Sequence, residues 1–96
     1  MKTKITKTEV KKALKLLGDG PQEVANALKR MRIKGVRHSF RDCPLARYLK
    51  KRFSAEIDVG EEDCDVGKVV EILLPPACRM FVKDFDSRRY LELIAR

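Results

Sequence analysis

The sequence predicts a small α+β protein: three N-terminal helices, a two-stranded antiparallel hairpin and a C-terminal helix, in an order like that of a winged helix. Apolar residues recur three and four positions apart in four segments, residues 6–17, 21–35, 44–53 and 76–85, which is the period of a helix. Two further segments, residues 55–59 and 68–74, are typical of strands. A chain of 96 residues is expected to form one domain over residues 1–96.

The first two helices carry recognisable ends. Thr6 and Glu9 have the spacing of a capping box, which predicts a helix beginning at Thr6 or Thr8 and ending at Leu17. Pro21 suits the first turn of the second helix, and Gly35 is expected to end it.

Residues 33–42 have no sustained period, and their apolar side chains, Ile33, Val36 and Phe40, are expected to hold the segment against the core. Asp42 or Cys43 is expected to cap the third helix, with Pro44 in its first turn. Its spacing places two sets of side chains on different faces. Leu45, Leu49 and Phe53 are expected to be buried, and Arg47, Lys50 and Lys51 to be exposed together.

The second half of the chain contains the strands. Residues 55–59 alternate, with Ile57 and Val59 facing inward, and residues 68–74 are rich in β-branched side chains. The acidic segment between them, residues 60–67, is expected to be a solvated loop joining the two strands of the hairpin. Pro75 and Pro76 are expected to stop the second strand and start the C-terminal helix, and residues 88–96 are expected to end the chain as a short helical segment.

Charge is distributed unevenly along the chain, whose formal net charge is +8. Residues 1–53 hold 16 Lys or Arg against 4 Asp or Glu, whereas residues 54–96 hold 6 against 10. This pattern predicts a positive face that meets a polyanion. The expected function is therefore non-enzymatic binding of DNA or RNA by a basic face of the first three helices, with these candidate contacts: Lys11, Lys15, Arg30, Arg32, Lys34, Arg37, Arg41, Arg47, Lys50 and Lys51.

Two observations favour a different class of protein. The connection from Met31 to Cys43 is longer than the turn of about three or four residues in a helix-turn-helix motif. The acidic hairpin loop would also be repelled by phosphate. The alternative is a small protein-binding regulator or inhibitor, adaptor-like or antitoxin-like, whose basic helices pair with an acidic partner.

Catalysis and metal binding find little support in the sequence. His38, Cys43, Cys64 and Cys78 lack the close spacing of zinc ligands, so we expect no metal and no cofactor. Cys43, at a helix N-terminus among arginines, could have a lowered pKa and be the most reactive thiol. Nothing orients a Cys43–His38 pair, so an enzyme is not expected. Free thiols, the lack of a long apolar run and the lack of a secretory signal predict a cytoplasmic protein without a membrane partner.

The order of motifs resembles a group of small uncharacterised bacterial proteins, some carried on mobile elements. These proteins pair a "GIxG" turn with a "CPxAxYL" helix, matched here by CPLARYL at residues 43–49, and end in "FxxxFDxGxYxxL". That ending is matched by Phe81, Phe85, Asp86, Tyr90 and Leu93, although Arg88 or Arg89 stands where a glycine is usual. The match covers most of residues 21–93 and implies a shared architecture, but no activity.

Overall fold

The computed structural model describes residues 5–95. Within them, the elements follow in this order: α1 (Lys7–Lys15), α2 (Pro21–Arg30), α3 (Pro44–Phe53), β1 (Ile57–Val59), β2 (Asp63–Val66), β3 (Val70–Leu73), α4 (Pro76–Asp86) and the 3-10 helix η1 (Leu91–Leu93). The predicted α+β class is confirmed, as is the order of three helices before the strands and one after them. None of the helices in the described part of the chain is long and apolar enough to cross a membrane.

The predicted two-stranded hairpin is wrong, because the sheet has three antiparallel strands in the order β1-β2-β3. The extra strand, β2, lies within residues 60–67, which were expected to be a solvated loop. Its residues alternate, so that Cys64 and Val66 are buried while Asp63 is exposed and Asp65 half-buried. β1 and β3 each pair with β2 and not with one another.

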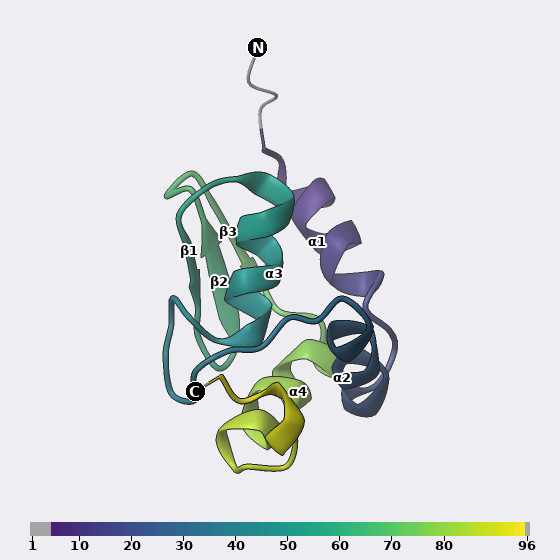
Figure 1. The fold of residues 1–96 in the computed structure, drawn as a ribbon. Coiled ribbons are helices and arrows are strands. Elements are labelled where there is room, and N and C mark those ends of the chain that lie inside the picture. Colours follow the sequence, from purple (N-terminus) through teal and green to yellow (C-terminus); the bar gives the residue numbers. More distant parts are fainter. Residues whose placement is uncertain (1–4, 96) are drawn as a thin grey trace.

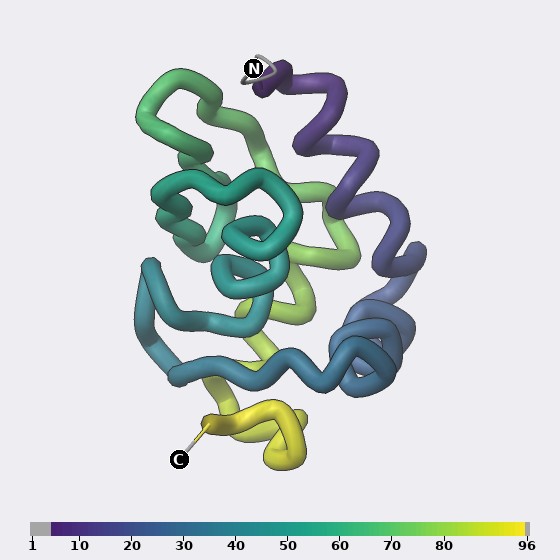
Figure 2. Tube along the Cα trace, turned by 45° about the horizontal axis from the view of Figure 1, so that its top comes forward, coloured from purple at the N-terminus to yellow at the C-terminus, as the bar shows by residue number. Residues whose placement is uncertain are grey.

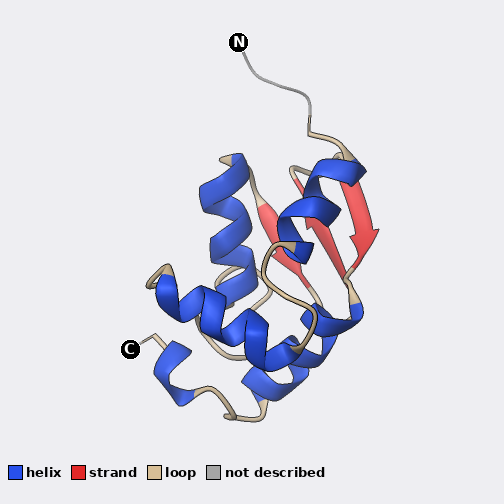
Figure 3. Cartoon of the chain, turned by 90° about the vertical axis from the view of Figure 1, so that its right-hand side faces the viewer, coloured by secondary structure: helices blue, strands red, loops and turns tan. Residues whose placement is uncertain are grey.

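The helices and the sheet enclose one hydrophobic core. In Figure 1 the sheet lies to the left, with α3 and α1 beside it and α2 and α4 below, and Figure 3 shows the strands as a single layer among the helices. The rings of Phe81, Phe85 and Tyr90 stack in the core, with centroids 5.9 Å (Phe81–Phe85) and 5.3 Å (Phe81–Tyr90) apart. The hydroxyl of Tyr48 on α3 donates a hydrogen bond of 2.6 Å to the carbonyl of Ala13 on α1.

The end of α2 differs from the prediction in a way that matters for the surface. The helix ends at Arg30 and not at Gly35, since Arg32 adopts a left-handed conformation with φ of 57°. The amide of Ile33 then donates to the carbonyl of Leu28, and the amide of Arg32 to that of Lys29. This pair of bonds is a Schellman motif, which usually has glycine where Arg32 stands.

Gly35 does not end α2; it allows the backbone to pass close to the start of α3. A Cβ atom there would lie 2.3 Å from the backbone nitrogen of Pro44, so no larger residue fits. On its other side, the Gly35 amide donates to the Leu93 carbonyl, and the Ala95 amide donates to the Gly35 carbonyl. The chain after α2 is therefore held between the start of α3 and the C-terminal segment.

The connection between α2 and α3 runs across the molecule and doubles back into α3 (Figure 2). Ile33 is buried as predicted, but Val36 is 42% and Phe40 66% exposed, so their expected place in the core is wrong. Hydrogen bonds of the backbone fix this course. The Val36 amide donates to the Asp42 carbonyl, and the Val59 amide of β1 donates to the Phe40 carbonyl, each at 2.7 Å.

The predicted helical end of the chain is reduced to η1, and Arg96 lies outside the described residues. Before η1, Arg88 adopts a left-handed conformation with φ of 67°. The amide of Arg89 donates to the carbonyl of Asp84, so α4 also ends in a Schellman motif. The turn after α4 therefore forms with Arg88 at the position where the FxxxFDxGxYxxL pattern has glycine.

Candidate nucleic-acid interface

A shallow depression on the surface is lined by five basic side chains from two parts of the chain. Arg32 and Lys34 come from the connection after α2, and Arg47, Lys50 and Lys51 come from α3, with Ile33 between them. We call this depression the basic groove. All five basic residues are among the candidate contacts predicted from the sequence.

The turn after α2 supplies one side of the basic groove. Its Schellman bonds turn the chain sharply, so that Ile33 points into the core, where it is only 6% exposed. Its two neighbours, Arg32 and Lys34, are consequently exposed on either side of it. The buried Ile33 thus anchors two cations at the surface.

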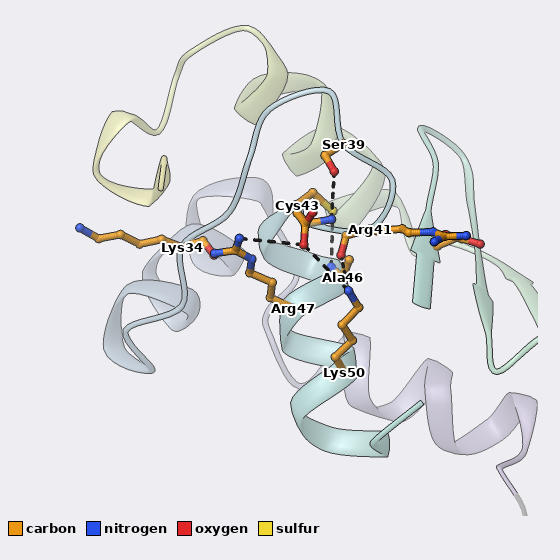
Figure 4. A network of polar contacts seen from close by, with 9 residues as sticks. Lys34, Ser39, Arg41, Cys43, Ala46, Arg47 and Lys50 are labelled. Atoms are coloured by element: carbon orange, nitrogen blue, oxygen red, sulfur yellow. Dashed lines mark hydrogen bonds and ion pairs between the residues drawn. The ribbon is translucent and has the colours of Figure 1, made fainter. Parts of the chain in front are cut away.

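α3 supplies the other side. Leu45 and Leu49 are fully buried, which turns the stripe of Arg47, Lys50 and Lys51 outward, whereas Phe53 is only partly buried. Figure 4 shows that two of these cations reach the neighbouring connection: Arg47 Nη1 donates to the Lys34 carbonyl at 3.1 Å, and Lys50 Nζ to the Arg41 carbonyl at 2.8 Å. Their side chains are about 40% exposed. Lys51 is exposed as expected, but Arg47 and Lys50 are less free than the spacing predicts.

The basic groove has little acidic compensation. The carboxylate of Asp42 lies 4.0 Å from both Arg47 Nη2 and Lys50 Nζ, and it is itself about half exposed. Within residues 5–95, Arg32, Lys34 and Lys51 form no ion pair. Three of the five cations are therefore available to an anionic ligand without breaking an intramolecular contact.

The other five predicted contacts lie outside the basic groove. Lys11, Lys15 and Arg30 are exposed on α1 and α2 but do not line the depression. Arg37 donates twice to the carbonyl of Asp86, at 3.1 and 2.9 Å, and Arg41 pairs with Asp58 at 3.2 Å. The last two arginines hold the connection in place.

The lowered pKa suggested for the Cys43 thiol is wrong. Its Sγ caps α3 by accepting a hydrogen bond of 3.4 Å from the Ala46 amide, but the residue is only 5% exposed. Burial raises the pKa of the Cys43 thiol to about 11, against the lowering expected from a helix N-terminus. His38 is turned toward Asp86, with 3.7 Å between Nδ1 and Oδ2.

The chain matches no protein-family model, no curated protein and no solved structure. The resemblance to small bacterial proteins therefore stays a prediction. Across residues 5–95, no group of three or more His, Cys, Asp or Glu side chains is placed to hold a metal ion. The candidate site is therefore identified from the positions of its basic side chains and not from similarity to another protein.

Asp65, which was expected in a solvated loop, instead forms part of an acidic row on the outer face of the sheet. Asp65 in β2 stands directly opposite Asp58 in β1 and opposite Glu71 in β3. Like charges in such positions repel one another. In the sequence, β2 could have been predicted from the alternation of polar Asp63 and Asp65 with apolar Cys64 and Val66. Aspartate is uncommon in strands, which weakened that signal.

Proposed function

We propose that the protein binds nucleic acid without catalysis, through the phosphates, in the basic groove. The observation that carries this proposal is the convergence of five Arg and Lys side chains from α3 and the preceding connection on one depression. Phosphate contacts by such side chains supply most of the affinity in sequence-independent binding. Arg47 and Lys50 are already oriented by backbone carbonyls, so little side-chain freedom is lost on binding.

The shape of the groove favours contact with phosphates over reading of bases. In a helix-turn-helix protein, the N-terminal residues of the recognition helix enter the major groove. Here the first turn of α3, Pro44 to Ala46, is buried, and the connection borders the exposed stripe at Lys34 and Arg41. α3 therefore offers the basic stripe along its side, and its N-terminal residues do not reach outward.

The test compares binding across a salt series. Labelled single-stranded and duplex oligonucleotides are titrated with the protein, and log Kd is plotted against log salt. Each phosphate contact contributes a slope of about 0.9 on duplex DNA and about 0.7 on single strands. Replacing Arg32, Lys34 and Lys51 by Gln should lower affinity and remove about two units of slope on single strands and about three on duplex DNA, since these cations have no ion pair within residues 5–95.

A matched control removes the same charge elsewhere. Replacing Lys68, Arg79 and Lys83 by Gln changes residues on the β2–β3 turn and on α4, outside the basic groove. This variant should keep most of the affinity and of the salt slope. Equal losses in the two triple variants would mean that only net charge matters. No binding by the parent at low salt would overturn the proposal.

The acidic row on the sheet favours a second candidate, a protein-binding regulator. Asp58, Asp65 and Glu71 would repel a polyanion but not a protein partner with mixed charge. In this candidate the basic groove accepts an acidic segment of the partner. Binding to polyglutamate in preference to every oligonucleotide in the salt series would favour it.

A further inference from the structure

The connection before α3 carries an exposed aromatic ring on a fixed backbone. Phe40 is 66% exposed, although apolar side chains of this size are usually buried. Its carbonyl accepts the Val59 amide of β1 at 2.7 Å, which fixes the residue against the sheet. A single exposed apolar side chain is common on protein surfaces, so its surroundings decide whether it has a role.

The surroundings of Phe40 are rigid on both sides. Before it, the His38 amide donates to Asp86 Oδ1 at 3.0 Å, and Arg37 donates twice to the Asp86 carbonyl. After it, the Asp42 amide donates to Ser39 Oγ at 3.0 Å. These bonds hold the backbone of the loop in a course that leaves the Phe40 ring exposed to solvent.

Phe40 is also joined directly to the basic groove. The next residue, Arg41, accepts the hydrogen bond from Lys50 through its carbonyl, and Lys50 lines the groove. The ring borders a second shallow depression, whose lining includes the basic Arg37 and Arg41 and the acidic Asp42 and Asp58. Both carboxylates lie near basic side chains, Asp58 at 3.2 Å from Arg41 and Asp42 at 4.0 Å from Arg47 and Lys50. A strand whose phosphates lie in the basic groove would therefore bring its next bases toward an exposed aromatic ring.

We propose that Phe40 stacks on an unpaired base, so that the ligand of the basic groove is single-stranded nucleic acid. This inference rests on the proposed function and specifies its ligand. Bases in a duplex are already stacked on one another, whereas the bases of a single strand can turn toward an aromatic side chain. Such stacking tolerates any base, which agrees with a groove that contacts phosphates.

The decisive variant is Phe40→Ala, assayed with oligothymidine, oligouridine and a duplex. Loss of stacking should weaken binding of the single strands by about 5- to 150-fold, the range found for aromatic residues under a base. Duplex affinity and the salt slope should not change, because no charge is removed. Phe40→Tyr should bind like the parent. The two single-stranded probes separate a DNA ligand from an RNA ligand.

A control variant and a fluorescent reporter complete the experiment. Leu73→Ala truncates a side chain of similar exposure, 69%, on the acidic face of the sheet, and should not alter binding. Since the chain has no tryptophan, Phe40→Trp introduces a sole reporter, whose emission should be quenched by single strands and not by duplex. Thermal melts of the parent and of Phe40→Ala should coincide, because the side chain is exposed.

The outcomes separate this inference from the proposed function. If the parent binds nucleic acid with the expected salt slope but Phe40→Ala binds single strands equally well, only the stacking role is overturned. If the Phe40→Trp emission responds equally to duplex and single strands, the preference for unpaired bases is overturned. If the parent binds no oligonucleotide at low salt, both proposals fail.

Discussion

The ammonium group of Lys50 donates a hydrogen bond of 2.8 Å to the backbone carbonyl of Arg41, nine residues earlier. This bond joins the exposed stripe of α3 to the connection that carries Phe40. Lys51, the next residue on the helix, is exposed and forms no ion pair within residues 5–95. Two adjacent lysines of the same groove therefore have different structural roles.

Comparing Lys50→Ala with Lys51→Ala tests this difference. Lys50→Ala should lower the free energy of unfolding by about 0.5–1.5 kcal/mol, because a hydrogen bond between elements is lost. Lys51→Ala should leave it within about 0.5 kcal/mol. Both variants should weaken oligonucleotide binding. Urea unfolding and the salt-series titration measure the two effects, and equal stability of the variants would contradict the role assigned to Lys50.

The acidic row of the sheet predicts a stabilising substitution. Asp65→Asn removes the charge that faces Asp58 and Glu71 but keeps the side-chain oxygen that accepts the Lys68 amide at 3.0 Å. The free energy of unfolding should rise by about 0.2–1 kcal/mol, and the gain should shrink as salt screens the repulsion. Asp19→Asn makes the same charge change at an exposed turn and should give no gain.

The three thiols predict a pattern of reactivity and of pH dependence. All are buried, and burial raises the pKa of Cys43 to about 11 and those of Cys64 and Cys78 to about 12. At pH 8 the three buried thiols are therefore almost entirely protonated, so Ellman's reagent should label the native protein slowly and the urea-unfolded protein rapidly. Rapid labelling of one thiol in the native state would contradict the burial of the cysteines.

The raised pKa values of the three thiols also determine how the free energy of unfolding changes with pH. A thiol whose pKa is higher in the folded state holds its proton more tightly there than in the unfolded chain. Its contribution is therefore complete below about pH 9 and is lost as pH rises toward 11–12. Urea midpoints should fall as pH rises from about 9 to about 11. Cys43→Ser, which keeps a side chain able to cap α3, should show a smaller fall.

Local features of the sequence predicted the helices well. The capping box is present, with the Glu9 amide donating to Thr6 Oγ1 and the Thr6 amide to Glu9 Oε1. The period of the apolar residues also placed Leu45 and Leu49 in the core. These signals involve residues three or four positions apart, so they do not depend on the rest of the fold.

The remaining features depend on contacts between distant residues. β2 is short and holds two aspartates, so its strand character comes from pairing with β1 and β3. The exposure of Phe40 follows from the bond of its carbonyl to Val59, and the path after α2 follows from the contact of Gly35 with Pro44. The spacing within α3 places Arg47, Lys50 and Lys51 on one face of the helix. It cannot show that Arg32 and Lys34, which precede the helix, line the same groove.

The two left-handed arginines allow the basic groove to be tested without loss of stability. Arg32 and Arg88 occupy equivalent positions in the turns that end α2 and α4, with φ of 57° and 67°. A side chain at such angles is disfavoured by about 1 kcal/mol or more, whereas glycine is not. Arg32→Gly and Arg88→Gly should each raise the free energy of unfolding by about 0.5–1 kcal/mol, because part of the gain is offset by the greater freedom of glycine in the unfolded chain.

Binding should separate the two variants, since each loses one positive charge but only Arg32 lines the basic groove. Arg32→Gly should bind oligonucleotides more weakly, with a salt slope smaller by about 0.7–0.9. Arg88→Gly should bind like the parent. A more stable protein that binds less well would exclude unfolding as the cause of the weaker binding. Equal affinities for the two variants would show that Arg32 is not a phosphate contact.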